Sequence, residues 1–328
     1  MEQKSVLIGM SGGVDSSVAA ALLKEQGYHV IGATMRLWTY SDSCNMKHEG
    51  CCAESAVEDA RRVCDKLGID FYVMNFKDMF KDKVVDYFVD EYIHGRTPNP
   101  CIACNKYLKF DALLKKALAM GIDYVATGHY AKIEKGEDGK YILRASEAVK
   151  KDQSYVLYNF TQEQLAHTLM PLGGYNKDWV RQKAEELGLG VAHKPDSQEI
   201  CFVEDDDYAK FITDYSGYKP KEGDILDVNG NVIGKHRGLI YYTIGQRKGI
   251  GAYGRPMFVM KIDAENNTIT LGEKGMEFSN ELTAYDVNFV SGEFPKENML
   301  ITAKVRYQAP PAAAMLCPQK DGTVKLMF

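Results

Sequence analysis

The fold is decided by the stretch Ser5-Val6-Leu7-Ile8-Gly9-Met10-Ser11-Gly12-Gly13-Val14-Asp15-Ser16-Ser17. Its first five residues form a short apolar run that predicts a buried strand, and helical spacing of apolar residues begins at Val14. The glycines between them let the backbone turn tightly and approach a ligand closely. A helix that begins at this point offers unpaired N–H groups and the positive end of its dipole to an anion. The stretch therefore predicts a strand, a phosphate-binding loop and a helix.

The chemistry of this loop favours one class of phosphate site. Ser11, Ser16 and Ser17 add hydroxyl donors, and Asp15 is a candidate ligand for Mg²⁺ beside the phosphates. The lysine of the Gly-Lys-Ser/Thr loop is missing, and so is the Gly-x-Gly-x-x-Gly spacing of dinucleotide folds. The pattern resembles the pyrophosphatase loop of enzymes that split ATP between the α- and β-phosphates. Such a loop indicates the reaction class, but argininosuccinate, asparagine, GMP and NAD synthetases share it, so the substrate stays open.

The rest of the N-terminal half alternates strands with helices. We expect strands at residues 28–35, 69–76 and 123–126, and helices at residues 53–67 and 108–120. This alternation predicts a parallel sheet with helices on both faces. After about Asp207 the segments become short and alternating, and Asn229-Gly230 is a strong hairpin signal. We expect an ATP-pyrophosphatase catalytic domain at residues 1–206, a β-rich central domain at 207–276 and a small C-terminal β-barrel, apparently truncated, at 277–328.

The bulk composition is that of an ordinary soluble protein. Hydrophobic residues make up 45% and charged residues 26% of the 328 residues. No apolar run has the length of a membrane span, and the N-terminus lacks the pattern of a secretory signal, so we expect a cytoplasmic protein. The formal net charge of −5 implies that any nucleic-acid site is a local basic surface. Eight cysteines are too sparse for a disulfide scaffold.

Two of the cysteines stand in polar, motif-like surroundings. Cys104 follows Pro98 and Pro100 at or near the start of a predicted helix, where the dipole and the nearby Lys106 and Lys109 favour the thiolate. Cys201 lies in the polar stretch of residues 195–202, although a small buried core residue is the plain alternative for it. Cys64 is expected in the core, and Cys317 on a strand without chemistry.

A set of motifs along the whole chain resembles the tRNA-specific 2-thiouridylases. The motifs occur in the family's order: Ser11-Gly12-Gly13-Val14-Asp15-Ser16-Ser17, Gly95-Arg96-Thr97-Pro98-Asn99-Pro100, Cys104-Asn105 with Lys109-Phe110, Ala126-Thr127-Gly128-His129-Tyr130-Ala131, Lys151-Asp152-Gln153-Ser154, Ser197-Gln198-Glu199-Ile200-Cys201-Phe202, Gly245-Gln246-Arg247 and Val305-Arg306-Tyr307.

The resemblance implies an activity and a set of site residues. ATP would adenylate the C2 oxygen of the wobble uridine, and Cys201, loaded as a persulfide by a cysteine desulfurase or a relay protein, would deliver sulfur, with Cys104 as the resolving thiol. The implied ATP-binding residues are Gly9, Met10, Ser11, Gly12, Gly13, Val14, Asp15, Ser16, Ser17, Met35 and Gly128. The implied tRNA contacts are Asn99, Pro100, Cys101, His129, Lys151, Asp152, Gln153, Arg306 and Tyr307. ATP and Mg²⁺ are the implied cofactors.

Two departures from the family pattern leave alternatives open. Aspartate stands at the position of Cys101 in many members, so Cys101, Cys104 and Cys201 could instead hold a [4Fe–4S] cluster with one open iron. Zinc bound by Cys101, Cys104 and two of Cys44, His48, Cys51 and Cys52 is a further option. The family's last domain usually continues further than residue 328, and a tRNA-contacting glutamine expected there is absent.

The terminal apolar segment at residues 323–328 predicts a strand that either pairs internally or marks a truncated chain. A track for tRNA phosphates is expected among Lys106, Lys109, Lys115, Lys116, Lys150, Lys151, Arg247 and Lys248. The rival functions are an ATP-pyrophosphatase enzyme that acts on a small metabolite and an inactive RNA- or metal-binding protein.

Overall fold

A parallel sheet forms the centre of the N-terminal half. The computed structural model describes residues 3–38, 54–196, 200–203, 206–276, 279–307 and 309–328. The five-stranded sheet has the order β3-β2-β1-β4-β7, and every neighbouring pair in it is parallel. Its strands are β1 (Ser5–Gly9), β2 (His29–Arg36), β3 (Asp70–Asn75), β4 (Tyr124–Ala126) and β7 (Thr168–Leu169). The strands predicted at residues 28–35, 69–76 and 123–126 are confirmed to within a residue or two at their ends.

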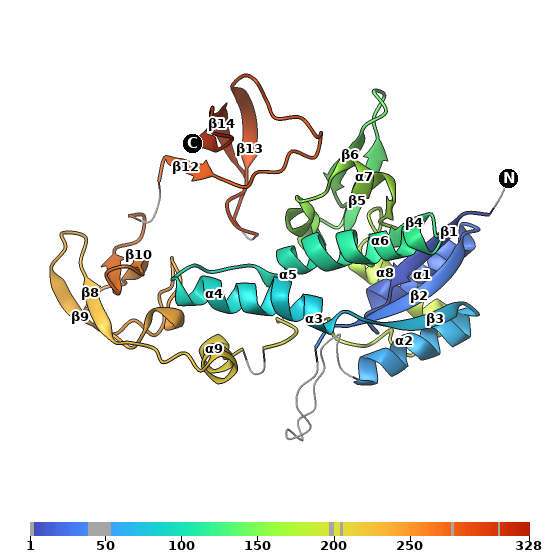
Figure 1. Ribbon diagram of the computed structural model, residues 1–328, viewed down its shortest axis with the longest axis horizontal. Helices are drawn as coiled ribbons and strands as arrows, with labels where there is room; N and C mark the ends of the chain where they lie inside the picture. The colour runs from blue at the N-terminus through green and yellow to red at the C-terminus, as the bar shows by residue number, and fades with distance from the viewer. Residues whose placement is uncertain (1–2, 39–53, 197–199, 204–205, 277–278, 308) are drawn as a thin grey trace.

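Helices cover both faces of this sheet, as the alternation predicted (Figure 1). Successive residues of a strand point to opposite faces, and β1 shows this: Leu7 packs in one hydrophobic core, and Val6 and Ile8 pack in the other. The core around Val6 and Ile8 includes buried residues of α1 (Val14–Glu25), α2 (Glu54–Leu67) and α8 (Lys177–Glu186). Both cores consist mainly of fully buried aliphatic and aromatic side chains.

Two long helices run along the opposite face (Figure 1). The first runs through α3 (Lys77–Phe80), the π-helical segment η1 (Lys81–Asp86) and α4 (Tyr87–Ile93). The second runs through α5 (Pro100–Ala103), the π-helical segment η2 (Cys104–Ala112) and α6 (Leu113–Ala119). The predicted helix at residues 108–120 is the C-terminal part of the second one, which begins eight residues earlier.

Smaller elements connect the sheet to the rest of the chain. An antiparallel hairpin, β5 (Ala131–Lys135) and β6 (Tyr141–Ala145), follows β4. The short helices η3 (Val149–Lys151), η4 (Ser154–Leu157) and α7 (Gln162–Ala166) lead from it to β7. Helix α9 (Tyr208–Ser216) buries Ala209 and Ile212 in the core that holds Leu7. The start of the predicted central domain is therefore packed onto the catalytic domain, and the domain limits stay a prediction.

The central part is a mixed four-stranded sheet with the order β10-β11-β8-β9. Its strands are β8 (Gly223–Leu226), β9 (Val232–His236), β10 (Phe258–Asp263) and β11 (Thr268–Gly272), and a short helix η5 (Leu239–Tyr241) follows β9. The hairpin predicted at Asn229-Gly230 joins β8 to β9, and Gly230 has the positive φ of 86° that favours glycine.

The C-terminal part is an antiparallel four-stranded sheet with the order β12-β15-β14-β13. Its strands are β12 (Glu281–Ala284), β13 (Met299–Ala303), β14 (Ala312–Pro318) and β15 (Val324–Met327). Within the described residues the sheet is open, with β12 and β13 at its edges, so the β-barrel that was expected to be truncated is not closed there. Strand β15 is the terminal strand that the sequence predicted. It pairs with β12 on one side and with β14 on the other, so its partners lie within the chain.

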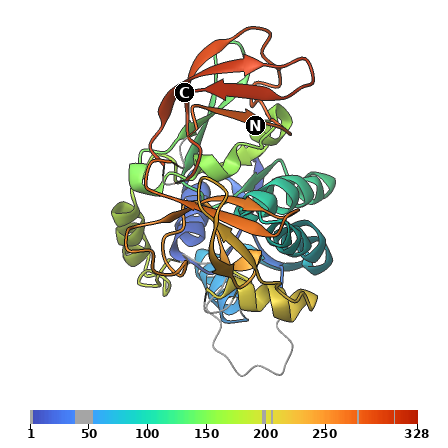
Figure 2. The same ribbon diagram turned by 90° about the vertical axis from the view of Figure 1, so that its left-hand side faces the viewer.

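The two antiparallel sheets occupy different parts of the molecule (Figures 1 and 2). Figure 2 shows the C-terminal sheet in red at one end, with the central sheet between it and α9. Among the described residues, no helix combines the length and the apolar character that crossing a membrane requires.

Candidate active site

The phosphate loop lies where the order of the parallel strands reverses. The chain passes from β1 to β2 on one side of β1 and later returns as β4 on its other side. In open α/β sheets, ligands bind outside the carboxyl ends of the strands at such a switch point. Met35 lies near the carboxyl end of β2, and Gly128 follows β4. Since β2, β1 and β4 are neighbours, the structure brings both predicted ATP-binding residues to the edge that carries the loop.

Hydrogen bonds within the loop hold its backbone in place. Gly12 adopts a positive φ of 69°, and the hydroxyls of Ser16 and Ser17 donate to the carbonyl of Gly13 at 3.2 Å and 2.8 Å. The backbone N–H of Ser11 donates to the hydroxyl of Ser16 at 3.2 Å. Gly13 caps α1 without a side-chain acceptor, so the first N–H groups of the helix keep their capacity for an anion.

Gly128 makes close contact with the start of α1. A Cβ atom at this position would lie 2.7 Å from the backbone nitrogen of Ser16 and 2.8 Å from the carbonyl carbon of Asp15. Only glycine allows strand β4 to lead into its loop this close to the phosphate-loop helix.

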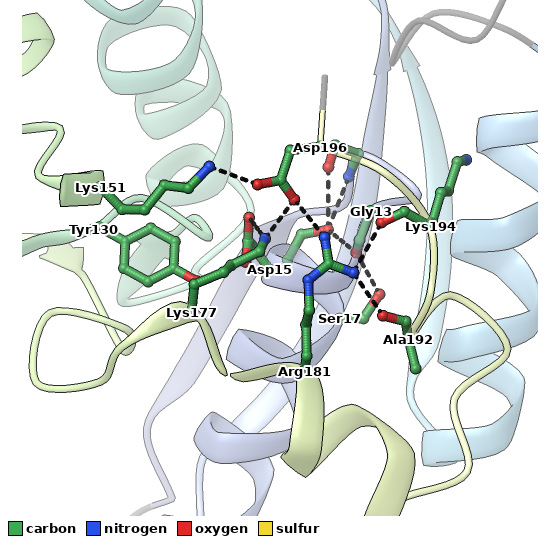
Figure 3. A network of polar contacts seen from close by, with 12 residues as sticks. Gly13, Asp15, Ser17, Tyr130, Lys151, Lys177, Arg181, Ala192, Lys194 and Asp196 are labelled. Carbon is green, nitrogen blue, oxygen red and sulfur yellow. Dashed lines mark hydrogen bonds and ion pairs between the residues drawn. The ribbon is translucent and has the colours of Figure 1, made fainter. Parts of the chain in front are cut away.

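A network of charged residues surrounds Asp15, and sequence reasoning did not identify most of it (Figure 3). Lys177 of α8 lies 2.7 Å and 2.8 Å from the two carboxylate oxygens of Asp15. The phenol of Tyr130 donates to the same carboxylate at 2.7 Å. Burial, and then the negative charge of Asp15, raise the pKa of Tyr130, so its phenol stays a neutral donor.

Asp196 is the second acceptor of the network. Its carboxylate lies 2.7 Å from Lys151, 2.7 Å from Lys177 and 3.1 Å from Arg181. Burial acts to raise the pKa of Asp196, but the hydrogen bonds from Lys151 and Lys177 outweigh it, and the pKa lies below its usual value. Asp196 is therefore an anion that joins α8 to the segment ahead of Cys201.

A third carboxylate closes the network on the other side of the loop. The ammonium of Lys194 donates to the carbonyl of Gly12 at 3.2 Å and to Asp59 of α2 at 2.9 Å. Four cations thus face three carboxylates beside the loop: Lys151, Lys177, Arg181 and Lys194 face Asp15, Asp59 and Asp196. The surplus positive charge suits a polyphosphate. Asp15 and Lys151 stand in motifs, but no local signal marks Lys177, Arg181, Lys194 and Asp59, because they are ordinary charged residues of helices and connecting segments.

Cys104 lies one turn inside its helix rather than at the helix start. The helix begins at Pro100, and the side chain of Asn99 accepts a hydrogen bond from the backbone N–H of Cys101 at 3.1 Å. Cys101 is exposed in the first turn, whereas Cys104 is buried. The dipole effect falls off within the first turn, so it acts more strongly on Cys101 than on Cys104.

Cys201 is half-buried, and the next residue, Phe202, is buried in the core. The ring of Phe202 lies 5.2 Å from that of Phe88 and 5.6 Å from that of Phe80, between centroids. Truncation of a buried phenylalanine typically costs about 3–5 kcal/mol. Cys104 belongs to the hydrophobic core that contains Phe202, and Cys201 packs against that core. The two cysteines therefore border one core, although 97 residues separate them.

The other cysteines are a core residue, a strand residue and the candidates for a metal site. Cys64 is fully buried on α2, and burial raises the pKa of its thiol to about 12, which confirms it as a core residue. Cys317 lies on β14, as expected. Within the described residues no three His, Cys, Asp or Glu side chains are arranged to hold a metal ion, so Cys101, Cys104 and Cys201 do not form a cluster site there. Of the zinc candidates, Cys44, His48, Cys51 and Cys52 lie outside the described residues.

His129 is buried just after strand β4. Its Nδ1 lies 2.7 Å from the hydroxyl of Thr127, and its ring lies 5.8 Å from that of Phe110. Burial, and then the positive charge of Lys109, hold the pKa of His129 well below its usual value. A direct contact between His129 and tRNA stays a prediction, and the neutral, buried ring is suited to packing.

Two of the remaining predicted tRNA residues, Arg306 and Tyr307, lie at a junction of the three parts of the chain. The phenol of Tyr307 donates to the carbonyl of Asp152 at 3.1 Å. A Cβ at Gly245 would lie 3.0 Å from Nη1 of Arg306, so this guanidinium lies against the Gly245-Gln246-Arg247 motif. Asn99 is half-buried, Pro100 is buried, and Arg306 and Tyr307 are exposed. Their contacts with tRNA stay predictions.

Several predicted phosphate-track lysines are already paired. Lys151 is bound to Asp196, Lys115 to Asp111 at 2.7 Å, and Lys106 to Asp286 at 3.2 Å. The ammonium of Lys116 lies 5.5 Å from the ring centroid of Phe76. A continuous track through all eight predicted positions stays a prediction.

Known proteins match the chain along nearly its whole length. Two family models match it: the tRNA methyl transferase HUP domain over residues 4–205 and the tRNA methyl transferase PRC-barrel domain over residues 209–273. The tRNA-specific 2-thiouridylase MnmA of Acetivibrio thermocellus is 57% identical over 331 residues, which cover 100% of this chain and 92% of the relative. The same-named protein of Clostridioides difficile is 58% identical, over 99% of this chain and 90% of the relative.

A solved structure of a 4-thiouridine synthetase–RNA complex with bound ATP is also similar. It is 18% identical, with a TM-score of 0.41, and the match covers 61% of this chain and 45% of that one. The description of the family models names methyl transfer, whereas the relatives with more than half of their residues identical are named as 2-thiouridylases. Identity of this level over the full chain shows that the chain belongs to the tRNA-specific 2-thiouridylase family.

Proposed function

We propose that this protein transfers sulfur to C2 of the wobble uridine of tRNA, at the cost of one ATP. One observation carries the proposal: a pyrophosphatase-type loop lies at the switch point of the sheet, and two motif cysteines border one core of the same domain. A metabolite-specific synthetase would need the loop but not the two cysteines. The 57% identical relative, named a tRNA-specific 2-thiouridylase, supports the same activity.

The first step activates the base. The C2 oxygen of uridine attacks the α-phosphorus of ATP, the bond to the bridging oxygen breaks, and pyrophosphate leaves. The adenylated oxygen is a much better leaving group than a carbonyl oxygen. The loop N–H groups and the surplus cations around Asp15 and Asp196 stabilise the charge on the leaving pyrophosphate. The base must leave the anticodon stack to reach this site.

The second step transfers sulfur. A cysteine desulfurase or a relay protein first loads Cys201 as a persulfide. The terminal sulfur attacks C2, and AMP departs with the former C2 oxygen. The thiolate of Cys104 then attacks the Cys201 sulfur, which forms a Cys104–Cys201 disulfide and releases the 2-thiouridine. A dithiol reductant returns the disulfide to two thiols for the next turnover.

Mg²⁺ fits the donors beside the loop. Mg²⁺ is usually held by one or two carboxylates together with substrate phosphates. Asp15 supplies such a carboxylate, and Lys177 and Tyr130 orient it. A bound ion would screen the phosphate charge. Within the described residues, Cys101, Cys104 and Cys201 are not grouped as ligands of a [4Fe–4S] cluster would be, which supports the persulfide route. The proposed partners are a tRNA with a wobble uridine and a sulfur donor protein, and the proposed location is the cytoplasm.

The decisive experiment measures both half-reactions. Unmodified tRNA with a wobble uridine is incubated with the protein, ATP, Mg²⁺ and a cysteine desulfurase, in parallel aerobic and anaerobic iron-loaded preparations. Mass spectrometry of the digested tRNA reports 2-thiouridine, and a coupled assay reports pyrophosphate. The variants are Cys104→Ala, Cys201→Ala and Cys317→Ala, the last as a matched half-buried cysteine from the C-terminal sheet.

We expect tRNA-dependent pyrophosphate release in all four proteins. Thiolation should disappear in Cys104→Ala and Cys201→Ala and persist in Cys317→Ala. Product that forms only in the iron-loaded sample would replace the persulfide route by the cluster. Pyrophosphate release with a metabolite and without tRNA would overturn the proposed substrate.

A further inference from the structure

Three consecutive residues, Lys151, Asp152 and Gln153, each contact a different distant segment of the chain. Lys151 pairs with Asp196, ahead of Cys201, at 2.7 Å. The carbonyl of Asp152 accepts the phenol of Tyr307, which belongs to the C-terminal part, at 3.1 Å. Gln153 binds the backbone of Tyr130 twice: its side-chain oxygen accepts from the N–H of Tyr130 at 2.9 Å, and its own N–H donates to the carbonyl of Tyr130 at 2.8 Å.

Tyr130 continues this connection to the phosphate loop. The residue is 2% exposed, and its phenol donates to Asp15 at 2.7 Å. Asp15 lies in the first turn of α1, two residues after Gly13 of the loop. An unbroken chain of hydrogen bonds and covalent links thus runs from Tyr307 through residues 152 and 153 and Tyr130 to Asp15. Figure 3 shows its last part, where Tyr130 and Lys177 meet at Asp15.

We propose that Tyr130 and Gln153 are positioning residues that couple segment 151–153, a predicted contact of tRNA, to the phosphate loop, so that tRNA binding strengthens ATP binding. The inference rests on the proposed function, which supplies both ligands. It adds a role for these residues that is separate from any contact with tRNA.

The physical basis is shared ordering. A ligand that fixes segment 151–153 also fixes Gln153, and through its two hydrogen bonds it fixes the backbone of Tyr130. Asp15 is then held before the nucleotide arrives, so ATP binding loses less conformational entropy. Linkage makes the effect reciprocal, so ATP must strengthen tRNA binding by the same factor.

The chain offers matched controls for both residues. The side chain of Gln162 also makes two hydrogen bonds to the backbone of one residue: it accepts from the N–H of Tyr141 at 2.8 Å and donates to the carbonyl of Tyr141 at 2.8 Å. It also donates to the carbonyl of Val290 in the C-terminal part. Within the described residues its hydrogen bonds lead to Tyr141 and Val290 and not to the phosphate loop. Tyr215 also donates its phenol to an aspartate, Asp86, at 2.5 Å. Each test variant therefore has a control that removes the same kind of hydrogen bond at a position without the proposed coupling. Gln162→Ala is the control for Gln153→Ala, and Tyr215→Phe is the control for Tyr130→Phe.

The test is a binding cycle by titration calorimetry. The probe is α,β-methylene-ATP with Mg²⁺, and its Kd is measured with and without saturating unmodified tRNA transcript. The ratio of the two Kd values is the coupling factor, which is expected to be at least about five in the native protein. We expect Tyr130→Phe and Gln153→Ala to bring this factor to within about two-fold of one, and both controls to keep the native value. A merely structural defect would change the Kd values without changing their ratio.

The outcomes separate this inference from the proposed function. A native protein that binds both ligands with a ratio of one would overturn the coupling and leave the thiolation proposal intact. An unchanged ratio in both Tyr130→Phe and Gln153→Ala would overturn the assignment to these residues. Failure of the native protein to bind either ligand would overturn both proposals. Tyr130→Phe keeps the ring and serves as the readout if Gln153→Ala does not fold.

Discussion

His129 and Tyr130 follow strand β4 and are both buried, yet burial shifts their pKa values in opposite directions. Burial lowers the pKa of His129 and raises the pKa of Tyr130, because it disfavours the charged form of each group. Both side chains are therefore neutral at physiological pH. They hold the loop after β4 through hydrogen bonds to Thr127 and Asp15.

The buried neutral His129 makes stability depend on pH. In the unfolded chain a histidine takes up a proton below about pH 6.5, whereas folded His129 does not. Below that pH the unfolded state binds more protons than the folded state. The contribution of His129 to stability is therefore full above about pH 6.5 and falls by up to about 1.4 kcal/mol per pH unit below it. We expect urea unfolding between pH 7.5 and 5 to show a shallower loss in His129→Gln than in the native protein. His193→Gln, which changes an exposed histidine, should keep the native dependence, and equal slopes in all three proteins would contradict the assignment.

At the scale of elements, the helix that begins at Pro100 places both neighbouring cysteines. Asn99 caps it, and proline at the first position fixes φ without losing a useful N–H. Cys101 and Cys104 are three residues apart and so lie on one side of this helix. Asn99 is also a predicted tRNA contact, so its two roles must be separated by experiment.

Substitution of Asn99 separates the cap from the contact. Loss of the cap in Asn99→Ala should lower the free energy of unfolding by about 1 kcal/mol, whereas Asn99→Asp, with another good capping side chain, should keep native stability. Urea unfolding measures the stabilities, and filter binding measures tRNA affinity. Equal stability of Asn99→Ala and the native protein would rule out the capping role. Weak tRNA binding by stable Asn99→Asp would support the contact, and unchanged binding by it would argue against one.

At the scale of the whole molecule, mostly polar contacts join the C-terminal part to the catalytic domain. Asn288 donates to the carbonyls of Tyr158 and Phe160 at 2.7 Å and 3.0 Å, and Lys106 pairs with Asp286. Interfaces of this kind permit relative movement of domains. The exposed Arg306 lies at the junction of the three parts and is therefore well placed to contact a large ligand that touches all of them.

The charge of Arg306 can be tested through the salt dependence of tRNA binding. Each phosphate contact contributes to the slope of log Kd against log salt concentration, so Arg306→Ala should weaken tRNA binding and lower the slope by about one. Lys115→Ala is the control, because Lys115 is exposed and already paired with Asp111 on its own helix. A native slope in Arg306→Ala would remove this residue from the tRNA surface.

The sequence predicted the class of fold and much of the candidate site. The strands, the helices on both faces and the core position of Cys64 follow from local apolar patterns. The C-terminal part was predicted as an apparently truncated β-barrel, and the described residues form an open antiparallel sheet, because alternating strands predict such a sheet but not its closure. Cys104 was predicted at or near a helix start, and the cap at Asn99 places it one turn after that start.

By itself, the sequence determined the phosphate loop, because glycines, an apolar strand and a helix start within thirteen consecutive residues fix the local backbone. Its motifs also determined the family. Only the tertiary structure decided which charges surround that loop. Lys177 meets Asp15 across 162 residues of chain, and Asp196 joins them because α8 packs on α1 beneath the switch point. Such meetings depend on the order of the strands and on helix packing, and no local pattern encodes either of them.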